Sequence, residues 1–419
     1  MLGPRYPRVI AMSAIDRVHE FLAAGLSSFP WRIVISDWQD RTFAIGGDRE
    51  HWCGQPLRIR FNNERGINDI LALNGKEVLE DFVRGDLDMT GNLYVLTQIE
   101  KYLDFRSAGW RLLGALVKNR FFQTIERARN NVSSHYDIPH DVLRCYLDRT
   151  YMSYSCAMFE DPTRLDRDEL TRTGEGQSDR FDSLEKGQWR KFRDAVEFID
   201  PGPGDTLLDV GCGYGGQLVV ALESGPFGKV VGCTHSHNQT VFGRQLLSEF
   251  DASTWELHEA DYREDTRVFD HVASTGMVSH VGPRGLVPYV RNIRQRIRSG
   301  GRYLHHALMS VHSSRSLDSA PGIAFNKKYV WPGFHWFTFG DHVKALEQNG
   351  FQVLRAVNLS PHYAKTAAAW YERFLQDKEV IRTLVNRETF RAWQIYLAGC
   401  SGAFTSARAH VYRLYCEAV

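Results

Sequence analysis

The chain has 419 residues, of which 43% are hydrophobic and 24% are charged, so it is long enough for two domains and too apolar for global disorder. Its net charge of +1 gives no reason to expect nucleic acid as a partner. Seven cysteines without a CxxC pair predict neither a disulfide framework nor a structural zinc site, and we expect no metal. No apolar run reaches the roughly 18 residues that cross a bilayer, and residues 1–26 carry charges through their apolar part, so we expect a cytoplasmic protein without a signal peptide.

Residues 1–105 are predicted to form a small α+β domain. The alternating stretches "WRIVISDW" (31–38) and "LRIRFNN" (57–63) are typical of strands. Helical spacing follows in "GINDILALNGKEVLEDFVRG" (66–85).

A basic amphipathic helix is predicted at residues 106–130. The segment holds six Arg or Lys against one Glu, interleaved with aromatic and aliphatic residues. One interpretation is a linker helix that packs its apolar face on a neighbouring domain. The other is contact with anionic lipid headgroups, since cations and aromatic rings are favourable at that interface.

Residues 131–419 alternate strand and helix patterns, which predicts a Rossmann-like α/β domain with a mostly parallel sheet. One candidate strand ends at a glycine turn, in "LLDVGCGYGG" (207–216). Further candidate strands are "KVVGCTH" (229–235), "HVASTGM" (271–277) and "GGRYLHHALM" (300–309).

The glycine turn is the most informative part of this domain. Glycine at 211, 213 and 215 allows positive φ and close approach of a ligand to the backbone, at the strand ends where open α/β sheets bind ligands. The spacing is not GxGxxG, and Asp209 directly before the turn suits a cationic or amine-bearing ligand. The alternative is a turn without a ligand.

The pattern D-x-G-x-G-x-G-G resembles motif I of class I S-adenosylmethionine (SAM) methyltransferases. In such enzymes the second strand normally ends in a carboxylate for the ribose, whereas this chain reads "VVGCTHSHNQ" (230–239). Asp261, in "EADYRED", is the candidate for the adenine amine.

Taken together, several segments between about residues 133 and 410 resemble the cyclopropane-fatty-acid synthase family, which includes mycolic acid cyclopropane synthases and methyl-branching fatty-acyl methyltransferases. In chain order the segments are "SSHYDIPHDVLRCYLDRTYMSYSCAMFED", "LLDVGCGYGG", "VVGCTHSHNQ", "ADYRED", "GMVSHVGP", "YLHHAL", "PHYAKTAAAWYERF" and "YLAGCSGAF".

The resemblance implies transfer of the SAM methyl group to a cis double bond of a lipid acyl chain, followed by removal of a proton that closes a cyclopropane ring. In the family a bound bicarbonate lies near the methyl group. Carried over, its pocket is formed by Cys156, His306 and Tyr363, with Leu308 on the same strand as His306. The resemblance and the glycine motif together assign SAM contacts to Tyr154, Ser155, Asp209, Gly211, Gly213, Gly215, Thr234, Ser236, Gln239 and Asp261.

The proposed pocket residues also have purely structural interpretations. In this interpretation Cys156 and Tyr363 only pack in the core, and His306 is an ordinary core histidine. The neighbouring His305 could occupy the pocket position in place of His306 if the alignment shifts by one residue. Cys156 is not expected to be a nucleophile, because methyl transfer is direct. The aromatic segment 329–339 lines either an acyl tunnel or an ordinary core.

The proposed cofactor contacts have alternatives too. Tyr154 and Ser155 form a structural turn in the alternative interpretation. Thr234, Ser236 and Gln239 instead belong to a helix cap, because Ser or Thr before an apolar helix often caps it.

The family's glutamate falls on Ser279 in "GMVSHVG", which brings no charge. The anion is then held by Ser279, His306 and Tyr363 alone, or His280 or His237 supplies the base. Alternatively the carbocation loses a different proton or shifts a hydride, which gives a methylene or methyl branch. The sequence leaves ring closure, these products and an inactive relative open.

The first function hypothesis is therefore methylation of unsaturated phospholipid acyl chains at the inner face of the membrane, with a homodimer and a reductase as further expectations. The second is a methyltransferase of the same family that acts on a small-molecule amine or natural product, which needs no strong base. A non-catalytic lipid-binding protein would be expected to lose the glycine turn, which is intact.

Overall fold

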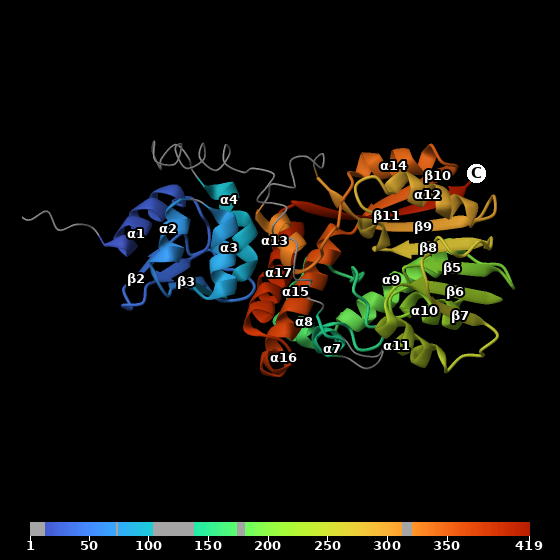
Figure 1. The fold of residues 1–419 in the computed structure, drawn as a ribbon, viewed down its shortest axis with the longest axis horizontal. Coiled ribbons are helices and arrows are strands. Elements are labelled where there is room, and N and C mark those ends of the chain that lie inside the picture. The colour runs from blue at the N-terminus through green and yellow to red at the C-terminus, as the bar shows by residue number, and fades with distance from the viewer. Residues whose placement is uncertain (1–12, 73, 104–137, 174–180, 312–320) are drawn as a thin grey trace, which may run out of the picture. The chain divides into compact units, whose positions relative to one another are not determined.

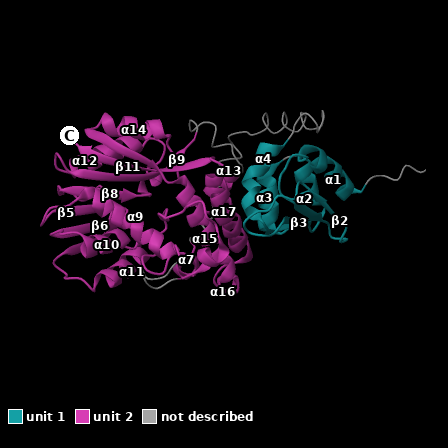
Figure 2. Cartoon of the chain, turned by 180° about the vertical axis from the view of Figure 1, so that it is seen from behind, with its two compact units in different colours: residues 1–133 teal, residues 134–419 magenta. Residues whose placement is uncertain are grey.

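The computed structural model describes residues 13–72, 74–103, 138–173, 181–311 and 321–419. The chain divides into two compact units, residues 1–133 and 134–419 (Figure 1, Figure 2). The basic segment 106–130 lies outside the described residues, so its predicted helix stays a prediction. None of the described helices is both long enough and apolar enough to cross a membrane.

Unit 1 is built around a four-stranded sheet in the order β2-β1-β3-β4. The strands β1 and β3 are parallel, whereas β2 and β4 pair antiparallel at the edges. Buried and exposed residues alternate along β3, as its sequence predicts. The small α+β domain is confirmed. Its elements are α1 (Ala14–Gly25), β1 (Ile33–Ser36), β2 (Thr42–Ile45), β3 (Leu57–Phe61), α2 (Glu64–Leu71), α3 (Gly75–Arg84), β4 (Leu87–Gly91), η1 (Leu93–Gln98) and α4 (Ile99–Tyr102).

Unit 2 is built on a seven-stranded sheet in the order β10-β11-β9-β8-β5-β6-β7. All pairs among β5 to β9 are parallel, and β11 runs antiparallel to both β9 and β10. The Rossmann-like, mostly parallel sheet is confirmed. The strands are β5 (Thr206–Val210), β6 (Lys229–Thr234), β7 (Trp255–Glu259), β8 (His271–Thr275), β9 (Arg302–Ser310), β10 (Phe351–Asn358) and β11 (Ala409–Ala418).

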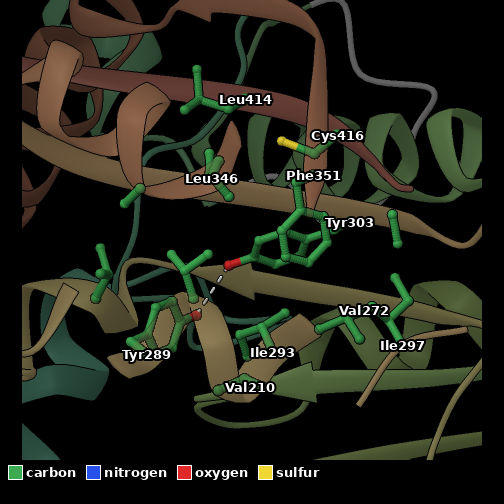
Figure 3. Packing of buried hydrophobic residues seen from close by; sticks show 14 of the residues in the cluster. Val210, Val272, Tyr289, Ile293, Ile297, Tyr303, Leu346, Phe351, Leu414 and Cys416 are labelled. Atoms are coloured by element: carbon green, nitrogen blue, oxygen red, sulfur yellow. Dashed lines mark hydrogen bonds between the residues drawn. The ribbon is translucent and has the colours of Figure 1, made fainter. Parts of the chain in front are cut away.

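Helices cover both faces of this sheet. On one face α9 (Leu184–Ile199) and α10 (Gly216–Ser224) bury a cluster that includes Phe192, Ala195 and Leu218, and α11 (His237–Leu247) packs beside them. On the other face α12 (Leu286–Gln295) and α14 (Phe339–Glu347) pack on a second cluster, in which the Tyr289 and Tyr303 hydroxyls are 3.3 Å apart (Figure 3).

A further group of helices packs together at one end of the sheet, and the β8 arrow points toward it in Figure 1. In this group α15 contacts α17, α8 and α7. The carboxyl ends of the parallel strands therefore face a helical layer, and the predicted site residues are drawn from both. The elements are α7 (His140–Tyr146), α8 (Arg167–Thr171), η2 (Met277–His280), α13 (Pro321–Tyr329), α15 (Ser360–Gln376), α16 (Lys378–Leu384) and α17 (Arg387–Thr405).

Candidate active site

The glycine turn follows β5 directly and takes a left-handed backbone at three positions. Gly211, Gly213 and Gly215 have φ values of 76°, 55° and 84°, which L-residues rarely adopt. A Cβ at Gly211 would lie 2.8 Å from the Met277 side chain. The turn is fixed to β6 because the backbone N–H groups of Gly211 and Cys212 both donate to the carbonyl oxygen of Cys233, at 3.0 Å each.

Asp209 lies on β5 just before this turn and is buried. Burial raises the pKa of its carboxyl to about 7, and the nearby ammonium of Lys191 acts in the opposite direction. A buried carboxylate at the strand end is suited to a cationic or amine-bearing ligand, as the sequence predicts.

Most of the other predicted cofactor residues form hydrogen bonds or ion pairs with protein groups near the ends of β6 and β7. Thr234 Oγ1 donates to Gln239 Oε1 at 2.6 Å, and Ser236 caps α11 by accepting from the Gln239 backbone N–H at 3.4 Å. Helix capping, one of the two interpretations, is therefore present. Asp261 follows β7 and pairs with Arg263, which holds the pKa of its carboxyl well below the ordinary value.

The Tyr-Ser-Cys segment is clamped from three sides. The buried carboxylate of Asp148 accepts from the backbone N–H groups of Tyr151 and Ser153, at 2.6 and 2.7 Å. Gln188 Nε2 on α9 donates to the carbonyl oxygen of Ser155 at 2.9 Å. The Ala157 backbone N–H donates to Thr366 Oγ1 on α15 at 3.0 Å. These contacts fix the three residues between Ser153 and Ala157, all of which the sequence predicts to contact ligands.

One cavity joins this segment to the end of β8, to β9 and to the helical layer. Of the predicted site residues it is lined by Tyr154, Ser155, Cys156, Ser279, His280, His306, Leu308 and Tyr363. Its other walls are mostly apolar or aromatic: Gly276, Asn326, Trp331, Phe334, Trp336, Trp370, Tyr396, Cys400 and Phe404. The structure does not bring the glycine turn, Asp209, Thr234, Ser236, Gln239 or Asp261 into this lining.

The polar groups of the cavity are neutral or unpartnered. Burial raises the pKa of the Cys156 thiol to about 12, and its S–H lies 3.2 Å from the Ala157 carbonyl oxygen. Ser279 Oγ is buried and has no hydrogen-bond partner among the described residues. Burial, reinforced by the cation of Arg413, holds the pKa of His306 well below its ordinary value. The Tyr363 ring stacks on Phe404, with centroids 4.5 Å apart.

The two histidines of β9 point to opposite sides of the sheet, as strand alternation requires. His306 lines the cavity, whereas His305 is buried on the other side, where its Nε2 lies 2.9 Å from His342 Nδ1. His237, one candidate for the missing base, lies 2.8 Å from Glu259 Oε2 and does not line the cavity. Within the described ranges no group of three or more His, Cys, Asp or Glu could hold a metal ion.

Two buried cations near the cavity were not predicted. Arg413 on β11 extends its Nε to 3.4 Å from His306 Nδ1, and Lys191 on α9 extends its Nζ to 2.8 Å from Ser155 Oγ. In the sequence both look like exposed charges of a strand and a helix, and only the packing of α9 against β9 reveals them. The sequence predicted part of the aromatic lining, because Trp331, Phe334 and Trp336 belong to the aromatic segment 329–339.

Comparison with known proteins gives the family. Residues 123–414, more than two thirds of the chain, match the family described as mycolic acid cyclopropane synthetase. The chain is 33% identical over 288 residues to a probable fatty acid methyltransferase of Pseudomonas putida, and the match covers 68% of each protein. It is 28% identical over 365 residues to the cyclopropane-fatty-acyl-phospholipid synthase of Escherichia coli K12, covering 86% of this chain and 87% of that one.

A solved structure agrees with these matches. The crystal structure of mycolic acid cyclopropane synthase CmaA1 complexed with SAH and CTAB superposes with a TM-score of 0.59 at 26% identity, and covers 69% of this chain and 97% of that chain. The chain therefore belongs to the family of cyclopropane-fatty-acyl-phospholipid and mycolic acid cyclopropane synthases, which are SAM-dependent methyltransferases.

Proposed function

We propose that this methyltransferase transfers the methyl group of SAM to the cis double bond of an unsaturated acyl chain carried by a phospholipid. One observation carries the proposal: a few small polar groups, among them Cys156, Ser279 and His306, lie inside a cavity whose other walls are mostly aromatic and aliphatic. An acyl chain needs apolar walls, and the reaction needs a few polar groups at one point along it. The names of the Pseudomonas and Escherichia relatives support the same substrate class.

The cavity walls suit the demands of an alkene substrate. When bound, SAM supplies a sulfonium methyl group, and an alkene attacks it slowly, so the protein has to hold both partners close and in line. The attack leaves a carbocation on the acyl chain. Trp331 and Trp370 offer aromatic faces, which attract cations, and the apolar lining excludes water that would trap the cation.

Proton removal then needs a base, and none of the described residues that line the cavity is Asp or Glu. Cys156 stays a neutral thiol, so we assign it to the wall of the pocket and not to a nucleophilic role. His306 is neutral, and Arg413 Nε can only donate to its Nδ1, so the imidazole proton lies on Nε2. His306 therefore acts as a hydrogen-bond donor toward the cavity.

The residues of the cavity fit a small oxyanion such as bicarbonate. Ser279 Oγ is a buried hydroxyl to which no described residue is hydrogen-bonded, and Tyr363 and His306 belong to the same lining. The side chains of Arg413 and Lys191 are buried near these residues, and their positive charges favour an anion in the cavity. These three donors would hold bicarbonate, which would supply the base that the lining lacks.

The product follows from which proton is removed. Loss of a proton from the transferred methyl group closes a cyclopropane ring or leaves a methylene group, depending on where the positive charge lies. For a saturated methyl branch, a hydride shift first moves the positive charge to the methylated carbon. Loss of a proton from the methyl group then leaves a methylene group, which a partner reductase reduces. Because Ser279 places no charge beside the bound anion, the proposal includes ring closure and methylene or methyl formation as equal alternatives.

We also propose that the chain works at the cytoplasmic face of the membrane. The basic segment 106–130, which in sequence follows the domain of residues 1–105 and precedes the catalytic domain of residues 131–419, would bind anionic headgroups. Assembly as a homodimer stays a prediction.

A second candidate is methylation of a small-molecule amine or natural product. The absence of a carboxylate from the described lining favours it, because an amine carries its own lone pair and needs no carbocation chemistry. Co-sedimentation with anionic vesicles separates the two functions, since an enzyme for soluble amines has no reason to bind them.

The test of the main proposal is incubation of the full chain with SAM and vesicles of an unsaturated phospholipid, followed by mass spectrometry of the released fatty acids. The proposal expects unsaturated chains that have gained one CH2 group. Vesicles of a fully saturated phospholipid are the matched control, because they offer no double bond.

A further inference from the structure

Lys191 is a fully buried lysine whose ammonium has only neutral hydrogen-bond partners. Its Nζ lies 2.6 Å from Ser153 Oγ, 2.8 Å from Ser155 Oγ and 2.6 Å from Gln188 Oε1. Across the described part of the chain, no carboxylate lies within ion-pair distance of it. Burial lowers the pKa of Lys191 to about 7, and the charge of Asp148 opposes this effect only in part, so a further anion nearby would stabilise the ammonium form.

The position of Lys191 links the cofactor crevice to the cavity. The charges that act on the pKa of Lys191 include the carboxylates of Asp148 and Asp209, the second of which lies near the end of β5, just before the glycine turn. Asp148 already accepts two backbone hydrogen bonds from the Tyr-Ser-Cys segment. On its other side Lys191 reaches Ser155, which lines the cavity.

Lys191 is the donor in each of its hydrogen bonds. The ammonium has three protons and no lone pair, so both serine hydroxyls accept from it. Ser153 Oγ and Ser155 Oγ are 3.0 Å apart, so the Ser153 hydroxyl can donate its proton to Ser155 Oγ. The Ser155 proton is then left for an acceptor in the cavity, and the positive charge of Lys191 strengthens it as a donor.

We propose that Lys191 is a positioning residue for the carboxylate of the methionyl end of SAM, which it binds through the hydroxyl of Ser155. The methionyl end is a zwitterion, and Asp209 offers a negative group for its ammonium while the Lys191–Ser155 pair offers a positive one for its carboxylate. This inference rests on the SAM contact that the family resemblance assigns to Ser155, but not on the identity of the methyl acceptor.

The experiment compares two ligands by calorimetry on the full chain without lipid: S-adenosylhomocysteine, which has the methionyl-type carboxylate, and 5′-methylthioadenosine, which lacks that end. Lys191→Met is expected to weaken S-adenosylhomocysteine at least tenfold and to leave 5′-methylthioadenosine within about twofold. Ser155→Ala keeps the lysine and is expected to show the same selectivity, so it decides the matter if Lys191→Met does not fold.

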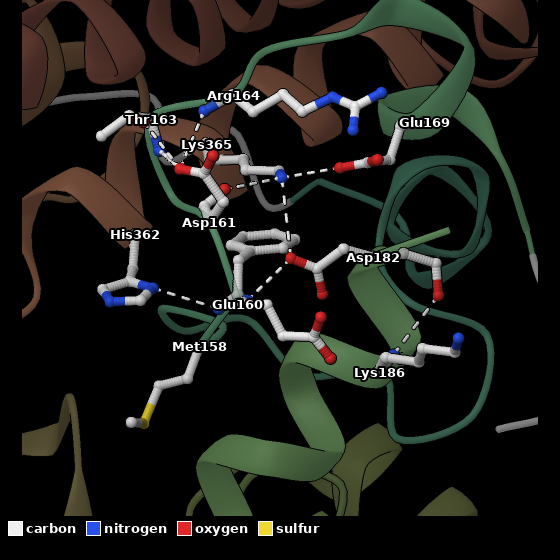
Figure 4. Close-up of polar contacts among 12 residues, drawn as sticks. Met158, Glu160, Asp161, Thr163, Arg164, Glu169, Asp182, Lys186, His362 and Lys365 are labelled. Atoms are coloured by element: carbon white, nitrogen blue, oxygen red, sulfur yellow. Dashed lines mark hydrogen bonds and ion pairs between the residues drawn. The ribbon is translucent and has the colours of Figure 1, made fainter. Parts of the chain in front are cut away.

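Lys365→Met is the matched control. Lys365 is also fully buried, but it pairs with Glu169 at 2.7 Å and donates to the carbonyl oxygen of Asp161 at 3.0 Å (Figure 4). It does not line the cavity. Its loss is expected to change both affinities equally, if at all. Equal weakening of both ligands by Lys191→Met and Ser155→Ala, or no weakening by either, would overturn the inference. Since no acyl substrate is present, this result is independent of whether the enzyme methylates lipid.

Discussion

The backbone N–H of His335 donates to the carbonyl oxygen of Ser279 at 2.9 Å, so the aromatic segment of residues 329–339 is bound directly to the position where the family carries its glutamate. This contact uses only the backbone of Ser279. Its hydroxyl stays buried in the cavity without a partner among the described residues. A substitution at this position therefore changes the chemistry of the cavity while the hydrogen bond to His335 is preserved.

Ser279→Glu is expected to change the product ratio or the rate, with little effect on SAM affinity. A carboxylate beside a bound anion makes that anion a stronger base, because like charges disfavour ionisation of the conjugate acid. A shift of one pKa unit corresponds to ~1.4 kcal/mol. Products are measured by mass spectrometry and SAM affinity by calorimetry. Ser279→Ala is the control for loss of the hydroxyl, and unchanged products and rates in Ser279→Glu would mean that this position does not touch the proton-removing groups.

Removal of Arg413 is expected to make catalysis sensitive to acid. Burial and the Arg413 cation together hold the pKa of His306 well below its ordinary value, so His306 stays neutral as the pH falls. Lys191 and His305 act in the same direction, but Arg413→Gln removes the largest of the charge effects, so the pKa rises and His306 becomes protonated at a higher pH than in the native chain. A charged His306 would weaken a neighbouring base, so kcat of the variant should fall toward acidic pH where native kcat does not.

Arg355→Gln is the matched control for that pH profile. Arg355 and Arg413 both pair with Asp194, but Arg355 is half exposed and does not contact His306. The control should keep the native pH dependence of kcat. A native profile in Arg413→Gln as well would show that the arginine does not govern His306.

Asp209→Ala is expected to abolish SAM binding in calorimetry, because it removes the only carboxylate at the end of β5. Since burial raises the pKa of Asp209 to about 7, the ionised form is lost as the pH falls below about 7, and native SAM affinity should decline in that range. Asp205→Ala, at the other end of the strand, should bind SAM normally. Unchanged affinity in Asp209→Ala would refute the placement of the cofactor at this turn.

The buried ion pair between Arg373 and Glu185 should be a main support of the site. Two hydrogen bonds of 2.8 and 2.9 Å join them, and Arg373 also holds the carbonyl oxygens of Leu147 and Leu170. Arg373→Met leaves a buried carboxylate unpaired, which costs about 3–5 kcal/mol of the free energy of unfolding. Denaturant unfolding followed by tryptophan fluorescence measures it. Arg382→Met breaks an exposed pair with Glu379 and a contact with the Phe390 ring, and should cost much less, about 1 kcal/mol.

Much of the fold was predictable because its signals are local. The glycine turn, the strands at 229–235 and 271–277 and the small N-terminal domain all follow from spacing within short windows. The strand β7 (Trp255–Glu259) was missed because it is an edge strand with a single buried residue, so its sequence lacks the apolar run of β6.

The candidate site was predictable only in part, for a physical reason. Cys156, His306 and Tyr363 lie in one cavity as the resemblance implied, although their roles remain proposals. Arg413 and Lys191 were missed because their burial depends on contacts more than thirty residues away in sequence, with His306 and with Ser153 and Ser155. No pattern within a single strand or helix reports such contacts.

The most direct test of lipid methylation uses SAM with a fully deuterated methyl group and vesicles of an unsaturated phospholipid, with mass spectrometry and NMR of the released acyl chains. We expect label on carbon attached at the former double bond, with one deuterium lost if a ring or methylene group forms. All three are kept if the chain itself loses the proton and a methyl-branched alkene forms. Acyl chains that contain no label, under conditions where the same preparation binds SAM in calorimetry, would contradict the proposed function.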